Sequence, residues 1–109
     1  MWYIFPQLQG VGFNATSRHY ALANAREAEA YVRHPVLGSR LARLGEELCA
    51  LAGHDATRIL GTHDDVKLRA CMTLFASLPG AEPVFQRVVD KFFQGLADEH
   101  TLRLLRQQA

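Results

Sequence analysis

The sequence predicts an all-α fold, an irregular orthogonal bundle of about five to six helices with an aromatic N-terminal coil. Apolar residues recur at three- and four-residue spacing, helix-capping residues precede these segments, and glycine or proline follows them. No segment of useful length alternates with the period of two that a strand requires. Since neither a repeat nor a low-complexity linker divides the chain, we expect residues 1–109 to form a single domain.

The first segment is rich in aromatic residues and is interrupted by proline and glycine. Pro6 and Gly10 exclude a long helix over residues 1–13, so we expect ordered coil that lies over the core. A short turn of helix capped by Thr16 or Ser17 follows. The apolar start of the chain is unusual, because terminal residues are normally polar and frayed.

Two helices are expected next. Asn24 followed by Glu27 is a capping-box pattern, and it predicts a helix that runs to about Arg33. Pro35 is well placed as the first residue of the following helix, which we expect to end at Gly53 as a left-handed cap. The leucines of this second helix fall within a stripe roughly 80° wide; they are Leu37, Leu41, Leu44, Leu48 and Leu51.

A short helical turn and a longer helix are expected in the middle of the chain. Asp55 opens the turn, which Gly61 closes. Thr62, with Asp65 three residues later, then starts a helix over about residues 63–78.

Two further helices complete the expected bundle. Pro83 opens the first, which carries apolar residues along one side, and Gly95 stops it. Asp98 can cap the last helix, which has Arg103 and Arg106 near its C-terminus, where cations suit the helix dipole. The apolar side of the first of these helices consists of Val84, Phe85, Val88, Val89, Phe92 and Phe93.

Composition narrows the function classes. A chain of 109 residues with 49% apolar and 21% charged residues is long and apolar enough for a packed core. The net charge of +1 gives no general basic field, so we expect neither nucleic acid nor a membrane surface as a partner. Because the apolar run before Pro6 is too short for a signal peptide or a membrane span, we expect a cytoplasmic protein.

The helix over residues 63–78 carries the most interesting polar residues. Lys67 falls on its apolar side, one turn from Cys71 and one turn from Asp64, so Asp64 and Lys67 can form an ion pair at the mouth of the core. A lysine in this position is able to lower the pKa of the Cys71 thiol. The alternative is that Lys67 extends outward while Cys71 simply packs, which is what most free cysteines do.

Metal and cofactor sites are not expected. The five histidines include no pair at the i, i+4 spacing of a helical zinc site. The chain also lacks the phosphate-binding, dinucleotide-binding, nucleophile-elbow and zincin motifs, so no cofactor is predicted. Cys49 and Cys71 have no CxxC spacing, and we expect reduced thiols.

Basic and aromatic residues near two helix starts are candidates for anion binding. His19, Tyr20 and His34, with Arg33 and Arg40 nearby in sequence, offer donors for a phosphate or carboxylate. The alternative is structural: Arg40 belongs with Arg43 and Glu47 to a solvated helix face, and the rings of Tyr20 and Tyr31 pack while their hydroxyls reach water.

Three blocks of the chain resemble a family of small bacterial proteins of unknown function. The blocks are MWYIFPQLQGVG, EAEAYVRHPVLGSRL and ILGTHDDVKLRACMTLF, they occur in the family's order, and the match covers most of the chain. The resemblance implies an all-α fold. Some members are labelled calpastatin after a eukaryotic protease inhibitor that is disordered, and we give that label no weight for so periodic a sequence.

The chain departs from the family in two respects. Similar members carry an additional N-terminal helical segment, so we expect this chain to be truncated, with apolar surface that a second copy is able to cover in a homodimer. Members also resemble Ser-Ser-Met-Thr-Leu-Phe where this chain has Ala70-Cys71-Met72-Thr73-Leu74-Phe75. This difference weakens any nucleophilic role for Cys71.

Our leading hypothesis is a domain that binds a small anionic or nucleotide-like ligand. An alternative is an enzyme that acts on a nucleotide or ADP-ribose-like substrate, with Asp64 or Asp65 as general base and Lys67 binding phosphate. A third hypothesis is an interaction module whose apolar N-terminal segment meets a partner. The candidate ligand contacts are His19, Tyr20, His34, Asp65 and Lys67.

Overall fold

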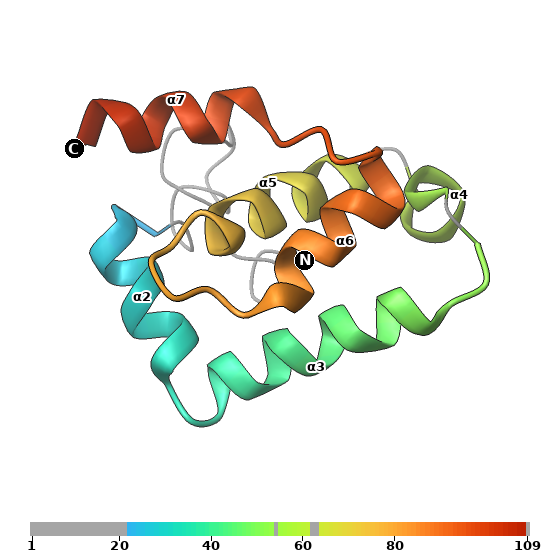
Figure 1. Cartoon of the computed structure of the whole chain (residues 1–109), viewed down its shortest axis with the longest axis horizontal. Helices are drawn as coiled ribbons and strands as arrows, with labels where there is room; N and C mark the ends of the chain where they lie inside the picture. Colours follow the sequence, from blue (N-terminus) through green and yellow to red (C-terminus); the bar gives the residue numbers. More distant parts are fainter. Residues whose placement is uncertain (1–21, 54, 62–63, 109) are drawn as a thin grey trace.

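The computed structural model describes residues 22–53, 55–61 and 64–108, and within them it contains helices and no strands. The predicted all-α fold is confirmed (Figure 1). The expected coil over residues 1–13 and the turn at Thr16 or Ser17 lie outside the described residues. The helices are α2 (Ala25–Arg33), α3 (Leu37–Ala50), α4 (Ala56–Leu60), α5 (Asp64–Ala76), α6 (Pro83–Phe93) and α7 (Glu99–Gln108).

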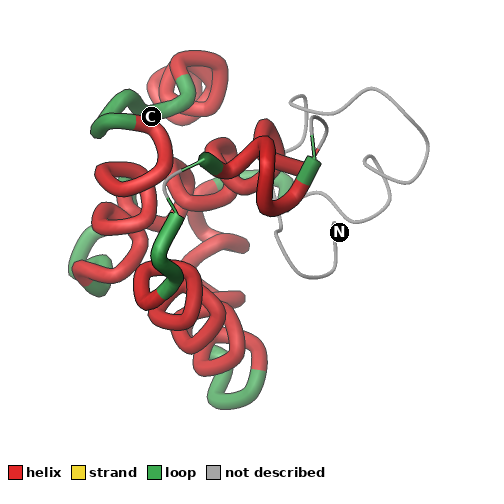
Figure 2. The backbone as a smooth tube through the Cα atoms, turned by 90° about the vertical axis from the view of Figure 1, so that its right-hand side faces the viewer, coloured by secondary structure: helices red, strands yellow, loops and turns green. Residues whose placement is uncertain are grey.

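Helix α5 is the centre of the bundle. It contacts α2, α4, α6 and α7, while α3 packs against α2 and α6. Figure 1 shows α3 and α7 on opposite sides of α5 and α6, and Figure 2 shows the same helices joined by short loops. The rings of Phe75 in α5 and Phe85 in α6 are fully buried, with their centroids 5.6 Å apart. No helix in the described ranges is long and apolar enough to cross a membrane.

The predicted capping pattern at the start of α2 is present. The Asn24 side chain accepts a hydrogen bond from the Glu27 backbone N–H at 3.0 Å. The Glu27 carboxylate reaches back to the N–H of Ala23 at 2.7 Å, one residue before the usual capping-box partner. The bond from the Glu27 N–H satisfies a backbone donor that the first turn of a helix leaves unpaired.

Helix α3 differs from its prediction at both ends and along its stripe. It begins at Leu37 rather than Pro35 and ends at Ala50 rather than at Gly53. Leu41 is buried, whereas Leu37 is 38% exposed. The reason is that α3 packs on α6 through one edge of the leucine stripe only, so the other edge stays open.

Helices α4, α6 and α7 begin as the sequence predicts, whereas α5 ends at Ala76, two residues before the expected Leu78, and its expected cap Thr62 lies outside the described residues. Asp55 caps α4 by accepting a hydrogen bond from the Arg58 N–H, and Asp98 caps α7 by accepting from the Thr101 N–H. Pro83 is the first residue of α6, and the left-handed Gln94 and Gly95 follow its last turn. Local capping chemistry therefore sets most boundaries of the bundle.

Candidate functional site

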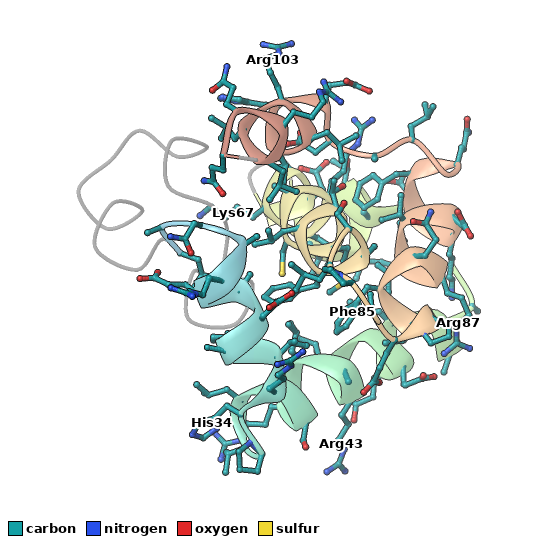
Figure 3. All side chains as sticks on the ribbon, turned by 60° about the vertical axis from the view of Figure 1, so that its left-hand side comes forward. His34, Arg43, Lys67, Phe85, Arg87 and Arg103 are labelled. Atoms are coloured by element: carbon teal, nitrogen blue, oxygen red, sulfur yellow. The ribbon has the colours of Figure 1, made fainter. Side chains whose placement is uncertain are left out.

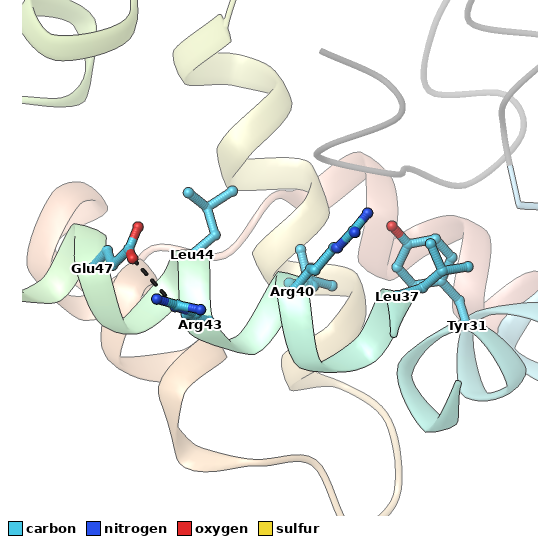
Figure 4. A pocket seen from close by; sticks show the side chains of 7 residues that line it. Tyr31, Leu37, Arg40, Arg43, Leu44 and Glu47 are labelled. Atoms are coloured by element: carbon cyan, nitrogen blue, oxygen red, sulfur yellow. Dashed lines mark ion pairs between the residues drawn. The ribbon is translucent and has the colours of Figure 1, made fainter. Parts of the chain in front are cut away.

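The open edge of the α3 stripe forms one wall of a groove of about 320 Å³. We call it the α2–α3 groove (Figure 4). Its floor is apolar because Leu37 and Leu44 are accessible in it, above the buried Leu41. A polar rim surrounds this floor. The groove is lined by Tyr31, Leu37, Arg40, Leu41, Arg43, Leu44 and Glu47.

Arg40 and Tyr31 stand together at one end of the α2–α3 groove. Figure 4 shows the Arg40 side chain reaching from α3 toward the hydroxyl of Tyr31 on α2. Within the described part of the chain, the Arg40 guanidinium forms no hydrogen bond and no ion pair. The groove thus offers a guanidinium with unused donors beside an aromatic hydroxyl.

The ring of Tyr31 packs against the core. Its ring lies 5.8 Å from the ring of Phe75, centroid to centroid, and is half-buried. Burial, and secondarily the neighbouring Cys71 thiol, raises the pKa of Tyr31 above its ordinary value. The hydroxyl therefore keeps its proton throughout the neutral range and is available as a hydrogen-bond donor.

The other end of the groove carries a balanced, exposed ion pair. Arg43 lies one helical turn from Glu47, with nitrogen and oxygen 3.6 Å apart and both side chains mostly exposed. Such pairs contribute little to stability and are screened by salt. Arg43 and Glu47 therefore match the predicted solvated helix face, whereas Arg40 does not pair with either.

His34 lies at the turn between α2 and α3 and has a structural task there. Its Nδ1 atom accepts hydrogen bonds from the backbone N–H groups of Val36 and Leu37, both at 3.1 Å. The imidazole thereby caps the start of α3, beside Leu37 of the groove. Nε2 does not take part in this cap.

Asp65 lines a different hollow, the α4–α5 cleft, which measures about 510 Å³. Its carboxylate accepts hydrogen bonds from the Thr57 hydroxyl and from the Val66 N–H. Arg69 in the same cleft donates to the carbonyl oxygens of Leu96 and Ala97. The polar groups of this cleft thus hold α4, α5 and the α6–α7 loop together.

Lys67 does not line the α4–α5 cleft with Asp65. Residues two positions apart in an α-helix are separated by about 200° around its axis, so Asp65 and Lys67 face opposite sides of α5. The structure therefore does not bring together these two predicted contacts. His19 and Tyr20 lie outside the described residues, as does the side chain of Asp64.

Cys71 is a core residue. Its side chain is fully buried, and burial raises the pKa of its thiol well above the ordinary value. The hypothesis that Lys67 activates this thiol is therefore wrong, because desolvation of the thiolate prevails. The packing interpretation describes Cys71 correctly. In the described ranges, no group of three or more acidic, histidine or cysteine side chains is arranged to hold a metal ion.

The buried thiol predicts a loss of stability at alkaline pH. The unfolded chain releases the Cys71 proton near its ordinary pKa of about 8.5, whereas the folded chain retains it. The stabilisation is complete below that pH and falls as the pH rises, by up to about 1.4 kcal/mol per pH unit. Urea unfolding between about pH 7 and about pH 9.5 measures this slope. We expect Cys71→Ala to flatten it; a slope in Cys71→Ala equal to that of the unaltered protein contradicts the assignment.

Comparisons with known proteins identify a family and a similar solved structure. The family model described as "Protein of unknown function (DUF1810)" matches residues 1–105. Among solved structures, the chain is similar to the crystal structure of the conserved hypothetical protein Rv1873 from Mycobacterium tuberculosis, with 35% sequence identity and a TM-score of 0.93. That match covers 96% of this chain and 75% of the other. A comparison with curated proteins finds no match.

Proposed function

The chain belongs to the DUF1810 family of proteins of unknown function, and we propose that it binds a small anionic, nucleotide-like ligand in the α2–α3 groove. One observation carries this proposal. The Arg40 guanidinium, without a partner in the described part of the chain, stands beside the Tyr31 hydroxyl above a floor of leucines.

The chemistry of the rim selects an anion. A guanidinium donates two parallel hydrogen bonds to a carboxylate or phosphate, and such charge-assisted bonds are the stronger ones. The Tyr31 hydroxyl, whose pKa is raised, supplies a further donor at neutral pH. Glu47 does not oppose this end of the groove because it pairs with Arg43.

The floor and the size of the groove select the rest of the ligand. Leu37 and Leu44 offer an apolar surface to a flat or aliphatic group. A volume of about 320 Å³ lies at the lower end of the range of about 300–1,000 Å³ that is typical of ligand pockets. A mononucleotide has the required combination of one anionic group and one flat, largely apolar group.

The proposal keeps the ligand class that the sequence suggests and changes most of its contacts. His34 borders the groove through Leu37, whereas Asp65 lines the α4–α5 cleft. An enzyme with Asp65 as general base and Lys67 binding phosphate needs both on one side of α5. Helix geometry separates them by about 200°, so we propose binding and not a reaction with Asp65 as general base. The side chain of Asp64, the other predicted base, lies outside the described residues.

A titration with adenosine monophosphate tests the proposal. We expect saturable binding by isothermal titration calorimetry, and weaker binding of adenosine, which has the same base and sugar without the phosphate. Arg40→Ala should weaken binding of the monophosphate by about 10- to 100-fold, since a hydrogen bond to a charged group contributes about 1.5–3 kcal/mol. Tyr31→Phe should weaken it several-fold.

Arg103→Ala is the matched control, since Arg103 is an exposed arginine on α7, far from α3 in Figure 3. It should bind the monophosphate like the unaltered protein. Equal affinities of the Arg40→Ala and Arg103→Ala variants, or no preference for the monophosphate over adenosine, contradict the proposal. Binding should also weaken as salt increases, because exposed charge interactions are screened.

A further inference from the structure

A second pocket lies on the other side of α2, between its last two turns and the loop that joins α5 to α6. Its volume is about 220 Å³. The buried side chains of Phe75, Phe85 and Leu78 lie beneath it, and its accessible apolar surface comes from Val32, Pro79 and Ala81. We call it the phenylalanine pocket. It is separate from the α2–α3 groove, whose lining residues it does not share.

Three charged side chains line this pocket. Glu29 and Arg33 lie one turn apart on α2, and Glu82 lies in the loop that enters α6. None of the three forms an ion pair or a side-chain hydrogen bond within the residues that the structure describes. Their hydrogen-bonding capacity is therefore available to a ligand.

Glu82 is notable because it occupies a capping position without capping. It is the residue that precedes α6, yet its side chain makes no capping hydrogen bond. Pro83 already removes one backbone donor from the first turn of that helix. The Glu82 carboxylate thus lines the pocket without being committed to the helix.

We infer that the phenylalanine pocket binds a free α-amino acid with an apolar side chain. A simple anion meets two carboxylates there, and a simple cation meets a guanidinium, so a ligand with only one charge is opposed by part of the rim. An α-amino acid carries an ammonium and a carboxylate on one carbon. Arg33 pairs with its carboxylate, Glu29 and Glu82 pair with its ammonium, and the accessible apolar atoms of Val32, Pro79 and Ala81 cover its side chain.

The pocket volume agrees with a ligand of this size. About 220 Å³ is below the range of about 300–1,000 Å³ in which drug-sized molecules bind. The apolar side chains of Val32, Pro79 and Ala81 favour an aliphatic side chain through burial of apolar area, and they do not offer a hydrogen bond to a polar one. Leucine is therefore a suitable probe.

Three related compounds test the inference. Leucine carries both charges, isoamylamine lacks the carboxylate, and 4-methylpentanoate lacks the ammonium, while all three keep the same branched apolar group. Titrations followed by calorimetry or by methyl NMR signals of the protein should give at least tenfold tighter binding of leucine than of either analogue. Isoamylamine that binds as tightly as leucine reduces the pocket to a site for amines and overturns the inference.

Variants separate the contributions of the two charges. Arg33→Gln should weaken leucine binding about tenfold and leave isoamylamine binding nearly unchanged. Glu82→Gln should weaken binding of leucine and isoamylamine alike. The matched controls are Arg103→Gln and Glu99→Gln on α7, which are exposed and remote.

Two further outcomes would overturn the inference that the pocket binds an apolar amino acid. No saturable binding of leucine in the millimolar range overturns the inference, as does equal behaviour of Arg33→Gln and Arg103→Gln. Circular dichroism and the urea midpoint of each variant show whether it is folded. Since these residues do not line the α2–α3 groove, binding of adenosine monophosphate is expected to be unaffected, and the two proposals can fail independently.

Discussion

Replacement of Gly38 by alanine is expected to destabilise the protein by about 3 kcal/mol, because no room exists for a methyl group at this position. A Cβ atom at Gly38 would lie 1.9 Å from the carbonyl oxygen of Val32 and 2.6 Å from its carbonyl carbon. These are backbone atoms of α2, so no side-chain rotation relieves the contact. Helices α2 and α3 must move apart instead.

Two effects of the Gly38→Ala substitution oppose each other. Alanine favours a helix over glycine by about 1 kcal/mol, which supports α3. Against this, the clash with Val32 forces open the tight turn between α2 and α3, where His34 also caps α3. Opening this turn loses the cap and the packing of α2 on α3, and we expect this loss to exceed the gain in helix propensity.

Urea and thermal unfolding measure the effect of Gly38→Ala. A loss of about 3 kcal/mol corresponds to a decrease in Tm of more than about 10 °C for a domain of this size. Gly53→Ala is the matched control, because the nearest atom to its new Cβ is the Ile59 methyl at 3.8 Å, an ordinary contact. Comparable stability of the two variants would show that the close approach of α2 and α3 is not essential.

Helix boundaries that depend on local chemistry could be predicted from the sequence. Asn24, Asp55 and Asp98 each cap a helix through a backbone N–H three residues later. Since both partners of such a bond are close in sequence, the pattern of residue types is sufficient to find them. Pro83 at the start of α6 follows the same rule.

The end of α3 could not be found in this way. The sequence predicts that Gly53 terminates the helix as a left-handed cap, yet α3 ends at Ala50, and Gly53 is not among the glycines with positive φ. The Lys91 ammonium, which donates to its last carbonyls, comes from α6, about forty positions further along the chain. A partner at that separation leaves no signal in the local pattern.

The candidate site was predictable only in part. The sequence identifies Arg40 as a possible donor and Tyr31 as a packed ring, but it does not reveal that the α2–α3 turn sets them in one groove. It also places the leucines of α3 in one stripe without showing which of them are buried, and packing on α6 leaves Leu37 38% exposed. Both facts depend on which edge of α3 meets α6, and this is decided by tertiary packing.

Replacement of Lys91 by methionine is expected to cost about 2–3 kcal/mol, because the ammonium of Lys91 caps the C-terminus of α3. Its Nζ donates hydrogen bonds to the carbonyl oxygens of Leu48 at 3.1 Å and Cys49 at 2.7 Å, and also to that of Leu51. An ammonium group has three donors, and the end of a helix has carbonyls without intrahelical partners. Methionine keeps an unbranched stem on the surface of α6 but leaves these carbonyls to water.

Lys91→Arg and Arg43→Met distinguish this cap from a general effect of charge. A planar guanidinium cannot direct three donors at one cluster of carbonyls as an ammonium does, so Lys91→Arg should recover only part of the loss. Arg43→Met removes a charge from the exposed pair with Glu47 and should change the free energy of unfolding by less than about 0.5 kcal/mol. Equal losses in Lys91→Met and Arg43→Met would contradict the capping role. Hydrogen exchange locates the effect of Lys91→Met along the chain. The N–H groups bonded within α6 should still exchange slowly. Those in the last turn of α3 should exchange faster, because this end of α3 is docked less tightly to α6.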